Sequence, residues 1–289
     1  MAIAQAPLQS VQAQFSYANW NDLYLKEKPY KLFIDLPQKH AHAPRTNLSF
    51  QPHATPVYDV RGNEAEFVLD KNGFEILRHG TEITDFGNVA AIEQIYFTEM
   101  KELIMGKVDG AKRVEVFDWR VRQSMSEEGF LTRKLNLSDP LDKIMPTIYP
   151  HIDQTPSGAV GRVRQHFSAE ADRLLQERVR IINVWRPLRT VENWPLAFCD
   201  TQTLQTRDLL AADYVRRHFV GETFFLLHSR DHRWYYLRDQ QPDEVAMFKI
   251  YDSDASATHG CPHASFSLGD EDSLAPRESI EIRALVFGG

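Results

Sequence analysis

The sequence lacks the features of a secreted or membrane-embedded protein. It has two cysteines among 289 residues, too few for a disulfide framework and typical of a reducing compartment. No apolar run approaches the roughly 20 residues that cross a bilayer. Residues 1–14 contain neither the basic segment nor the apolar segment of a secretory signal. We therefore expect a cytoplasmic protein without membrane insertion.

A surplus of basic residues is also missing. Lysine and arginine together number 33 against 40 acidic residues, and the formal net charge is -7. This balance argues against non-specific nucleic-acid binding. The hydrophobic content of 43% is ordinary for a globular protein. We expect a small-molecule partner and no nucleic acid. For the oligomeric state, we consider a homodimer.

Short β-branched and aromatic runs separated by turn residues fill the sequence. The most regular run covers 178–187, is rich in Val and Ile, and closes on Pro187. Other strands are expected at 11–17, 30–36, 57–61, 65–70, 113–122, 195–199, 223–227, 234–237, 244–251 and 279–287, and helices at 89–105, 157–177 and 209–219.

This density of strands predicts a mainly β protein with flanking helices and a double-stranded β-helix core of the jelly-roll or cupin-like kind. No internal repeat or linker divides the chain. We predict a single domain over 1–289, in which an N-terminal extension of strands and a helix (about 1–145) packs on the jelly-roll core.

His151 and Asp153 are separated by one residue within a short apolar stretch. On a β-strand, residues i and i+2 point to the same face, so the imidazole and the carboxylate would aim at one point. A second histidine would complete the 2-His-1-carboxylate set that binds non-haem Fe(II). We favour His263, because Pro262 suits the start of a strand, and His259 is the alternative third ligand.

Arg277 and Ser279 follow His263 and share one face of the last strand. A guanidinium binds a carboxylate through two parallel hydrogen bonds, and a hydroxyl on the same face adds another. These groups suit the far carboxylate of a dicarboxylic co-substrate. Arg283 falls on the same face and is the alternative anchor. Surface ion pairs with acidic neighbours are the other interpretation of these arginines.

The strand at 113–122 alternates, so that Val114, Val116, Asp118, Arg120 and Arg122 share a face. We expect the three charged residues to line either a substrate pocket or a solvated surface. Two further pocket candidates, Trp185 and Arg186, lie at the end of the 178–187 strand. Their other interpretations are a packed core aromatic and a structural ion-pair residue.

The order His151-x-Asp153, distal His, Arg277-x-Ser279 resembles the signature of the Fe(II)/2-oxoglutarate-dependent oxygenases. The gap between Asp153 and His263 is wider than in the common plant-type enzymes. About ten short motifs over most of the chain are similar to the fungal gibberellin-desaturase-like family, which includes the cephamycin 7α-methoxylase component and endoperoxide-forming oxygenases. They include Asp59-Val60-Arg61, Val116-Phe117-Asp118, Asn183-Val184-Trp185-Arg186-Pro187-Leu188 and Pro262-His263-Ala264-Ser265-Phe266.

This resemblance implies an oxygenase of secondary metabolism that uses Fe(II), 2-oxoglutarate and O2. Its substrate would be a small natural product such as a terpenoid or meroterpenoid, which is hydroxylated, desaturated, converted to an endoperoxide or rearranged. The iron ligands would be His151, Asp153 and His263. Two other classes stay open: a zinc-dependent jelly-roll hydrolase or isomerase, and a non-catalytic jelly-roll binding module.

Overall fold

The computed structural model describes residues 8–34, 36–40, 42–125, 136, 139–216, 219–257, 260–269 and 274–289. His259, the alternative third ligand, lies outside these residues. No helix in the described part of the chain has the length and apolar character needed to cross a bilayer.

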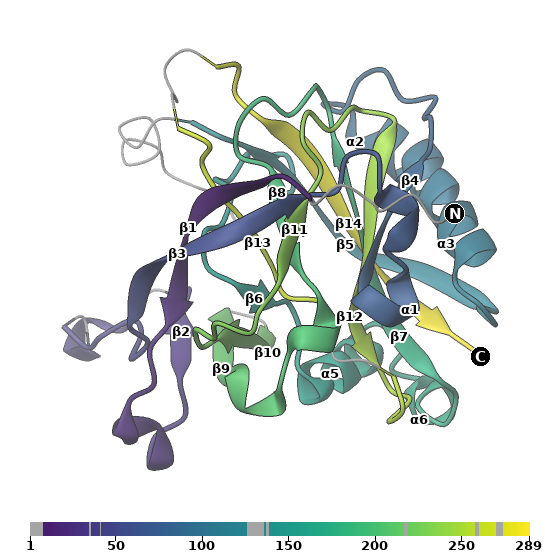
Figure 1. Ribbon diagram of the computed structural model, residues 1–289. Coiled ribbons are helices and arrows are strands. Elements are labelled where there is room, and N and C mark those ends of the chain that lie inside the picture. Colours follow the sequence, from purple (N-terminus) through teal and green to yellow (C-terminus); the bar gives the residue numbers. More distant parts are fainter. Residues whose placement is uncertain are drawn as a thin grey trace.

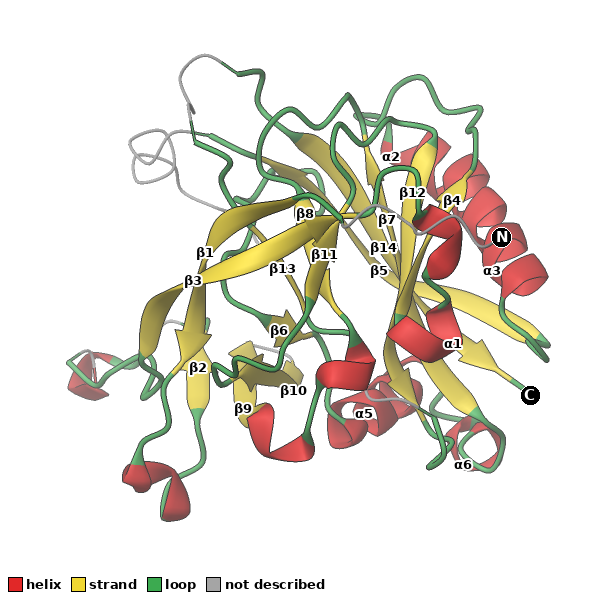
Figure 2. Ribbon diagram, viewed as in Figure 1, coloured by secondary structure: helices red, strands yellow, loops and turns green. Residues whose placement is uncertain are grey.

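The described residues form two β-sheets that pack face to face (Figures 1 and 2). The strands are β1 (Ser10–Ala18), β2 (Tyr30–Leu32), β3 (Phe50–Asp59), β4 (Phe74–Arg78), β5 (Arg113–Gln123), β6 (His151–Ile152), β7 (Val179–Pro187), β8 (Leu196–Cys199), β9 (Leu209–Arg216), β10 (Phe219–Leu226), β11 (Trp234–Tyr236), β12 (Glu244–Asp252), β13 (His263–Ser265) and β14 (Glu278–Phe287). One sheet has nine strands in the order β1-β3-β11-β8-β13-β6-β10-β9-β2, and the other has five in the order β4-β12-β7-β14-β5.

The helices are short and lie outside the sheets (Figure 2). They are α1 (Leu69–Asn72), α2 (Val89–Ala91), the π-helix η4 (Ile92–Tyr96), α3 (Phe97–Lys107), α5 (Pro156–His166) and α6 (Ala171–Leu174), with 3-10 turns η1 (Asp22–Leu25), η2 (Gln38–His40), η3 (Glu64–Glu66), η5 (Thr201–Thr203) and η6 (Thr206–Asp208). The mainly β fold class expected from the sequence is therefore confirmed.

The central strand β7 is apolar on both faces, and each face has its own cover. Ile181 and Trp185 point into the core between the two sheets. Ile182 and Val184 point the other way, into a second core beneath α3. Between the sheets, the ring of Phe198 on β8 packs against that of Phe248 on β12, with centroids 5.2 Å apart. A strand buried in this way loses the strict alternation of a half-exposed strand.

Three predicted segments are wrong. A helix was expected at 209–219, but residues 209–216 form β9 and residue 219 begins β10, because these two strands pair with each other along their length. Residues 65–70, expected as a strand, form η3 and part of α1. The single helix expected at 157–177 is two helices, since α5 ends at His166. Long-range strand pairing outweighs local propensity in the first case.

A β-bulge divides β5 between a first half that contains Val114 and Val116 and a second half that contains Asp118, Arg120 and Arg122. Arg283 of β14 pairs with Asp118, whereas Ala284 pairs with Val116, so Phe117 is the extra residue. One additional residue moves everything beyond it to the opposite face. Val116 therefore packs in the core beneath α3, while Asp118 faces the space between the sheets. The prediction that the valines and the charged residues of β5 share one face is therefore wrong, because the bulge separates the two groups.

Gly260 lies where two strands approach closely. A Cβ at this position would stand 2.1 Å from the carbonyl oxygen of Ile250 and 2.8 Å from Ile152 Cγ2. We predict that Gly260→Ala lowers the free energy of unfolding by about 1–3 kcal/mol, because the backbone cannot yield as a side chain does.

Thermal unfolding of the purified variant measures this effect. Gly161→Ala is the control, because Gly161 lies in α5 with open space around it. It should stabilise the protein by about 0.5–1 kcal/mol. An unchanged Tm for Gly260→Ala would contradict the close approach.

Candidate metal centre and adjoining cavity

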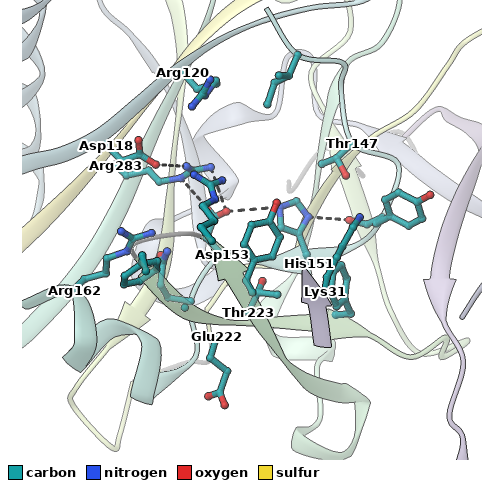
Figure 3. Close-up of a pocket in the computed structure, with 18 of the residues that line it drawn as sticks. Lys31, Asp118, Arg120, Thr147, His151, Asp153, Arg162, Glu222, Thr223 and Arg283 are labelled. Carbon is teal, nitrogen blue, oxygen red and sulfur yellow. Dashed lines mark hydrogen bonds and ion pairs between the residues drawn. The ribbon is translucent and has the colours of Figure 1, made fainter. Parts of the chain in front are cut away.

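Strand pairing brings two histidines together. His263 of β13 is the cross-strand partner of His151 on β6, and the ring centroids lie 4.4 Å apart. Asp153 follows β6 directly, and its Oδ1 lies 3.7 Å from His151 Nε2 (Figure 3). Each of the three residues offers one ligand atom, and these atoms all lie within 4.8 Å of one another. The structure therefore brings together the three residues that the sequence suggested.

Backbone carbonyls orient both imidazoles. His151 Nδ1 donates to the carbonyl oxygen of Tyr149 at 2.8 Å, and His263 Nδ1 donates to that of Cys261 at 3.2 Å. Because a carbonyl only accepts, each Nε2 keeps its lone pair for a metal. Burial lowers the pKa of His151 to about 4 and also lowers the pKa of His263. Both rings are thus neutral near pH 7, as a metal ligand must be.

Residues of the opposite sheet hold the Asp153 carboxylate. Asn183 Nδ2 donates to Oδ2 at 2.7 Å, and Arg283 donates to Oδ2 at 3.0 Å and to Oδ1 at 3.2 Å. Burial alone would raise the pKa of Asp153, but Arg283 and the two histidines bring it below its usual range. The carboxylate is therefore ionised. This donor set fits Fe(II) in 2-His-1-carboxylate coordination.

Asn183 was not predicted as a site residue. The signal was present: it is the one amide side chain in the middle of the apolar run of β7. Its burial is complete, and its inward direction follows from its position between Ile181 and Trp185 on the same face. Such a residue needs a polar partner inside the protein.

Arg283 joins the metal centre to the cavity. Besides Asp153, its guanidinium pairs with Asp118 at 2.7 Å and with Glu281 at 2.7 Å. Three carboxylates of the protein thus surround it. This arrangement does not support the alternative role of Arg283 as an anchor for the co-substrate.

Arg277, by contrast, is a buried cation with unused donors. Its side chain is 1% exposed, and Nη1 reaches only Ser265 Oγ, at 3.4 Å. Its Nε and Nη2, together with Ser279 Oγ, have no hydrogen-bond partner in the described part of the chain. Burial lowers the pKa of Arg277 to about 9. A buried, unpaired guanidinium is costly without an anion, so this set fits the carboxylate of a ligand.

A cavity of about 220 Å³ opens beside the histidine and aspartate ligands (Figure 3). Asp118, Arg120 and Arg122 all line it, as the pocket interpretation of β5 required. Most of the other polar residues that line the cavity were not predicted as site residues. These residues are Lys31, Thr147, Gln154, Arg162, Tyr214, Arg216, Glu222 and Thr223.

Trp185 and Arg186 do not line this cavity. The Trp185 ring is buried, 5.5 Å from the guanidinium carbon of Arg277. Arg186 points to the other face of β7 and donates to the carbonyl oxygens of His79 and Pro242. Its prediction as a pocket residue is corrected, because successive residues of a strand face opposite ways.

The two packed β-sheets hold an Asp and two His between them, and a buried arginine has no anion. Together these features define the class of Fe(II)/2-oxoglutarate-dependent oxygenases. The comparisons agree. The family described as "Oxidoreductase/YMDC permease-like domain" matches residues 15–287. "Hydroxylase/desaturase efuI" of Hormonema carpetanum is 32% identical over 263 residues, 86% of this chain and 88% of that protein.

"Fe(II)/2-oxoglutarate-dependent dioxygenase nvfI" of Aspergillus novofumigatus (strain IBT 16806) is 32% identical over 254 residues, 85% of this chain and 87% of that protein. The solved structure titled "iron and alpha-ketoglutarate-dependent endoperoxidase NvfI" matches with a TM-score of 0.82 and 28% identity, over 97% of this chain and 98% of that chain. The chain belongs to this family of Fe(II)/2-oxoglutarate-dependent dioxygenases and hydroxylase/desaturases.

Family membership confirms four predictions from the sequence. The protein is an oxidoreductase of the dioxygenase type. It requires Fe(II), 2-oxoglutarate and O2. Its substrates are small molecules of fungal secondary metabolism. Its core is the jelly roll. The zinc hydrolase and the binding module find no support in these relatives.

Replacing Arg283 tests its role as the counter-ion of the buried carboxylates. We predict that Arg283→Met lowers the free energy of unfolding by about 3–5 kcal/mol, because Asp153 and Glu281 lose their cation. Denaturant unfolding of the metal-free protein measures the loss.

The control is Arg173→Met, whose ion pairs with Glu170 and Glu177 lie on an exposed surface. It should cost less than about 1 kcal/mol. Equal losses in the two variants would show that the Arg283 network is not a buried one.

Proposed function

We propose that His151, Asp153 and His263 bind the Fe(II) and that Arg277 and Ser279 bind the far carboxylate of 2-oxoglutarate. The observation that carries the first assignment is the convergence of the three ligand atoms within 4.8 Å. The second rests on the three polar atoms of Arg277 and Ser279 that lack partners in the described part of the chain. His263 is preferred over His259 because its ring lies beside that of His151.

Bound together, iron and 2-oxoglutarate supply the O2-dependent oxidation of a substrate C–H bond. The protein's part is to fix the geometry. Asn183 and Arg283 hold the Asp153 carboxylate, and the Tyr149 and Cys261 carbonyls hold the imidazoles. The Phe248 ring, 4.7 Å from that of His263, covers the side of the site that faces the core. Such supporting contacts set ligand orientation and limit the access of water.

The cavity beside His151 and Asp153 is the proposed substrate site, with Asp118, Arg120 and Arg122 among its polar contacts. The relatives are named as a hydroxylase/desaturase and as an endoperoxidase. We propose a terpenoid or meroterpenoid as the substrate. Hydroxylation, desaturation, endoperoxidation and rearrangement are the outcomes that incubation with such compounds and mass analysis of the products would distinguish.

We further propose that the chain works as one domain, in which the N-terminal part (about 1–145) packs on the jelly-roll core. Pairing of β3 with β11 and of β5 with β14 supports this arrangement. The two buried, unpaired thiols of Cys199 and Cys261 support a reducing compartment such as the cytoplasm. A homodimer stays a prediction, which light scattering on the purified enzyme tests.

Loss of any iron ligand should abolish metal retention. We predict that His151→Ala, Asp153→Ala and His263→Ala each lose bound iron and succinate formation, because two ligands do not hold Fe(II) tightly. Under anoxic conditions, wild-type protein with Fe(II) and 2-oxoglutarate should show a weak visible charge-transfer band, and the variants should not.

His166→Ala is the matched control, since His166 is exposed at the end of α5. His259→Ala tests the alternative ligand. Full activity in His263→Ala together with inactivity in His259→Ala would sink the assignment of His263 while leaving the enzyme class intact.

Arg277 should separate co-substrate binding from folding. We predict that Arg277→Met keeps its iron, does not lower the Tm of the ligand-free protein, and raises the 2-oxoglutarate requirement by about 100-fold. The free protein loses only an unpaired buried cation, whereas the complex loses a charge-assisted contact of about 3 kcal/mol.

Thermal unfolding with and without 2-oxoglutarate, followed by a titration of succinate formation, measures both parts. Ser279→Ala should raise the requirement only several-fold, because one hydroxyl contributes about 1 kcal/mol. If the co-substrate still stabilised Arg277→Met as much as the wild type, another residue would be the anchor.

A further inference from the structure

Cationic side chains outnumber acidic ones around the proposed substrate cavity. Its lining includes Lys31, Arg120, Arg122, Arg162, Arg216 and Arg283. The acidic lining residues are Asp118, Asp153 and Glu222.

These three carboxylates already have cationic partners. Asp118 and Asp153 pair with Arg283, and Glu222 pairs with Lys28, which does not line the cavity. Counted together with Glu281, which also pairs with Arg283, these groups comprise six cations and four acids, so an excess of positive charge remains. Arg283 lies among three carboxylates and is not available to a ligand, so the groups that bear on ligand binding are Lys31, Arg162 and Arg216.

Aromatic rings, in place of acids, support three of these cations. The Arg162 guanidinium lies 3.9 Å from the centroid of the Phe219 ring. Arg216 lies over its neighbour Tyr214 at 5.3 Å, and Lys31 over Tyr149 at 5.7 Å. Within the described ranges, no ion pair joins these three cations to a carboxylate. A cation on a ring face keeps its full charge available to a ligand.

Arg162 is the best-defined of these groups. It lies on α5 and lines the cavity, and Figure 3 shows it on the side of Asp153 away from His151. Its Nη1 donates to Gln165 Oε1 at 3.2 Å, and its buried Nε has no hydrogen-bond partner in the described part of the chain. Burial lowers its pKa to about 10; Asp118 and Asp153 raise the pKa, Arg283 and Arg216 lower it, and the group stays charged near pH 7. An anion in the cavity would offset the repulsion from Arg283 and Arg216.

Besides the charged groups and the polar Thr147, Gln154 and Thr223, the lining has apolar residues that suit a carbon skeleton. Phe219, Phe225 and Ile144 contribute to the cavity, and Figure 3 shows Arg162 and Lys31 on either side of the His151–Asp153 pair. A ligand placed here would contact rings and aliphatic groups along its body and cations at its edge. This pairing of an apolar wall with a charged edge selects amphiphilic molecules.

We propose that the substrate is an organic anion, an apolar skeleton bearing a carboxylate or phosphate-like group that binds to Arg162, with Arg216 and Lys31 adding to the positive potential. This inference rests on the proposed function, since it assigns the substrate class of the same cavity. Anchoring one charged end would fix which C–H bond of the skeleton faces the metal centre.

Matched small probes test the charge requirement. The enzyme is loaded with Fe(II) and saturating 2-oxoglutarate without oxygen, and calorimetry measures the binding of 2-naphthoate, 2-naphthylphosphonate and the neutral 2-naphthamide. We expect 2-naphthoate to bind at least tenfold more tightly than the amide, with the charge-transfer band retained. Tighter binding of the phosphonate than of the carboxylate would assign the group as phosphate-like.

Variants locate the anchor. Arg162→Gln should reduce the preference for the acid over the amide to less than threefold, and Arg162→Lys should keep part of it. The control is Arg164→Gln on the same helix, whose side chain is 65% exposed and does not line the cavity. It should leave the preference unchanged. Arg216→Gln, at an exposed position, gives a second variant that does not depend on the folding of Arg162→Gln, and it should weaken the preference.

Three results would overturn the proposal: equal binding of acid and amide, an acid preference that survives in both Arg162→Gln and Arg216→Gln, or displacement of 2-oxoglutarate by 2-naphthoate. Failure of the proposed function would give a different experimental result. The charge-transfer band would then be missing from wild-type protein before any probe is added, while calorimetry still compares acid with amide.

Discussion

The Asp153 carboxylate, held between the two sheets, is the contact on which the site depends. Asp153 directly follows β6 of the nine-stranded sheet, and its carboxylate accepts hydrogen bonds from Asn183 and Arg283 of the five-stranded sheet. A buried carboxylate without such donors would be neutral and free to turn. With them it is ionised and fixed. The same contact holds the sheets at the spacing at which His151 and His263 face it.

The bulge at Phe117 extends this arrangement into the cavity. Without the extra residue, the face of β5 that carries Asp118 would continue the valine face beneath α3, and three charged groups would be buried in an apolar core. The bulge turns them inward, where Arg283 meets Asp118. One irregular residue in a strand thus allows a single element to serve both a hydrophobic core and a charged cavity.

Local patterns predicted the parts of the site that depend on local geometry. The i, i+2 spacing of His151 and Asp153 survives although β6 is only two residues long, and the shared face of Arg277 and Ser279 follows from the regular pleat of β14. Arg162 could not be found in this way. A charged residue within the helix expected at 157–177 has no local signal that separates a cavity position from a solvated one, and only the packing of α5 against β10 brings Arg162 to Phe219. The helix predicted at 209–219 was wrong for the same reason, because pairing with β10 determines the conformation of β9.

The cationic groups of the site have a common energetic consequence. Arg277 is buried without an anion, and the cavity cations rest on rings, so the protein without ligands contains charges that repel one another. Natural proteins keep such destabilising groups where function needs them. Arg122, which lowers the pKa of Arg277 and lines the cavity, lies within electrostatic reach of both regions. An anion bound at either place therefore lessens the repulsion felt at the other, and 2-oxoglutarate and an anionic substrate would stabilise the enzyme through the same set of arginines.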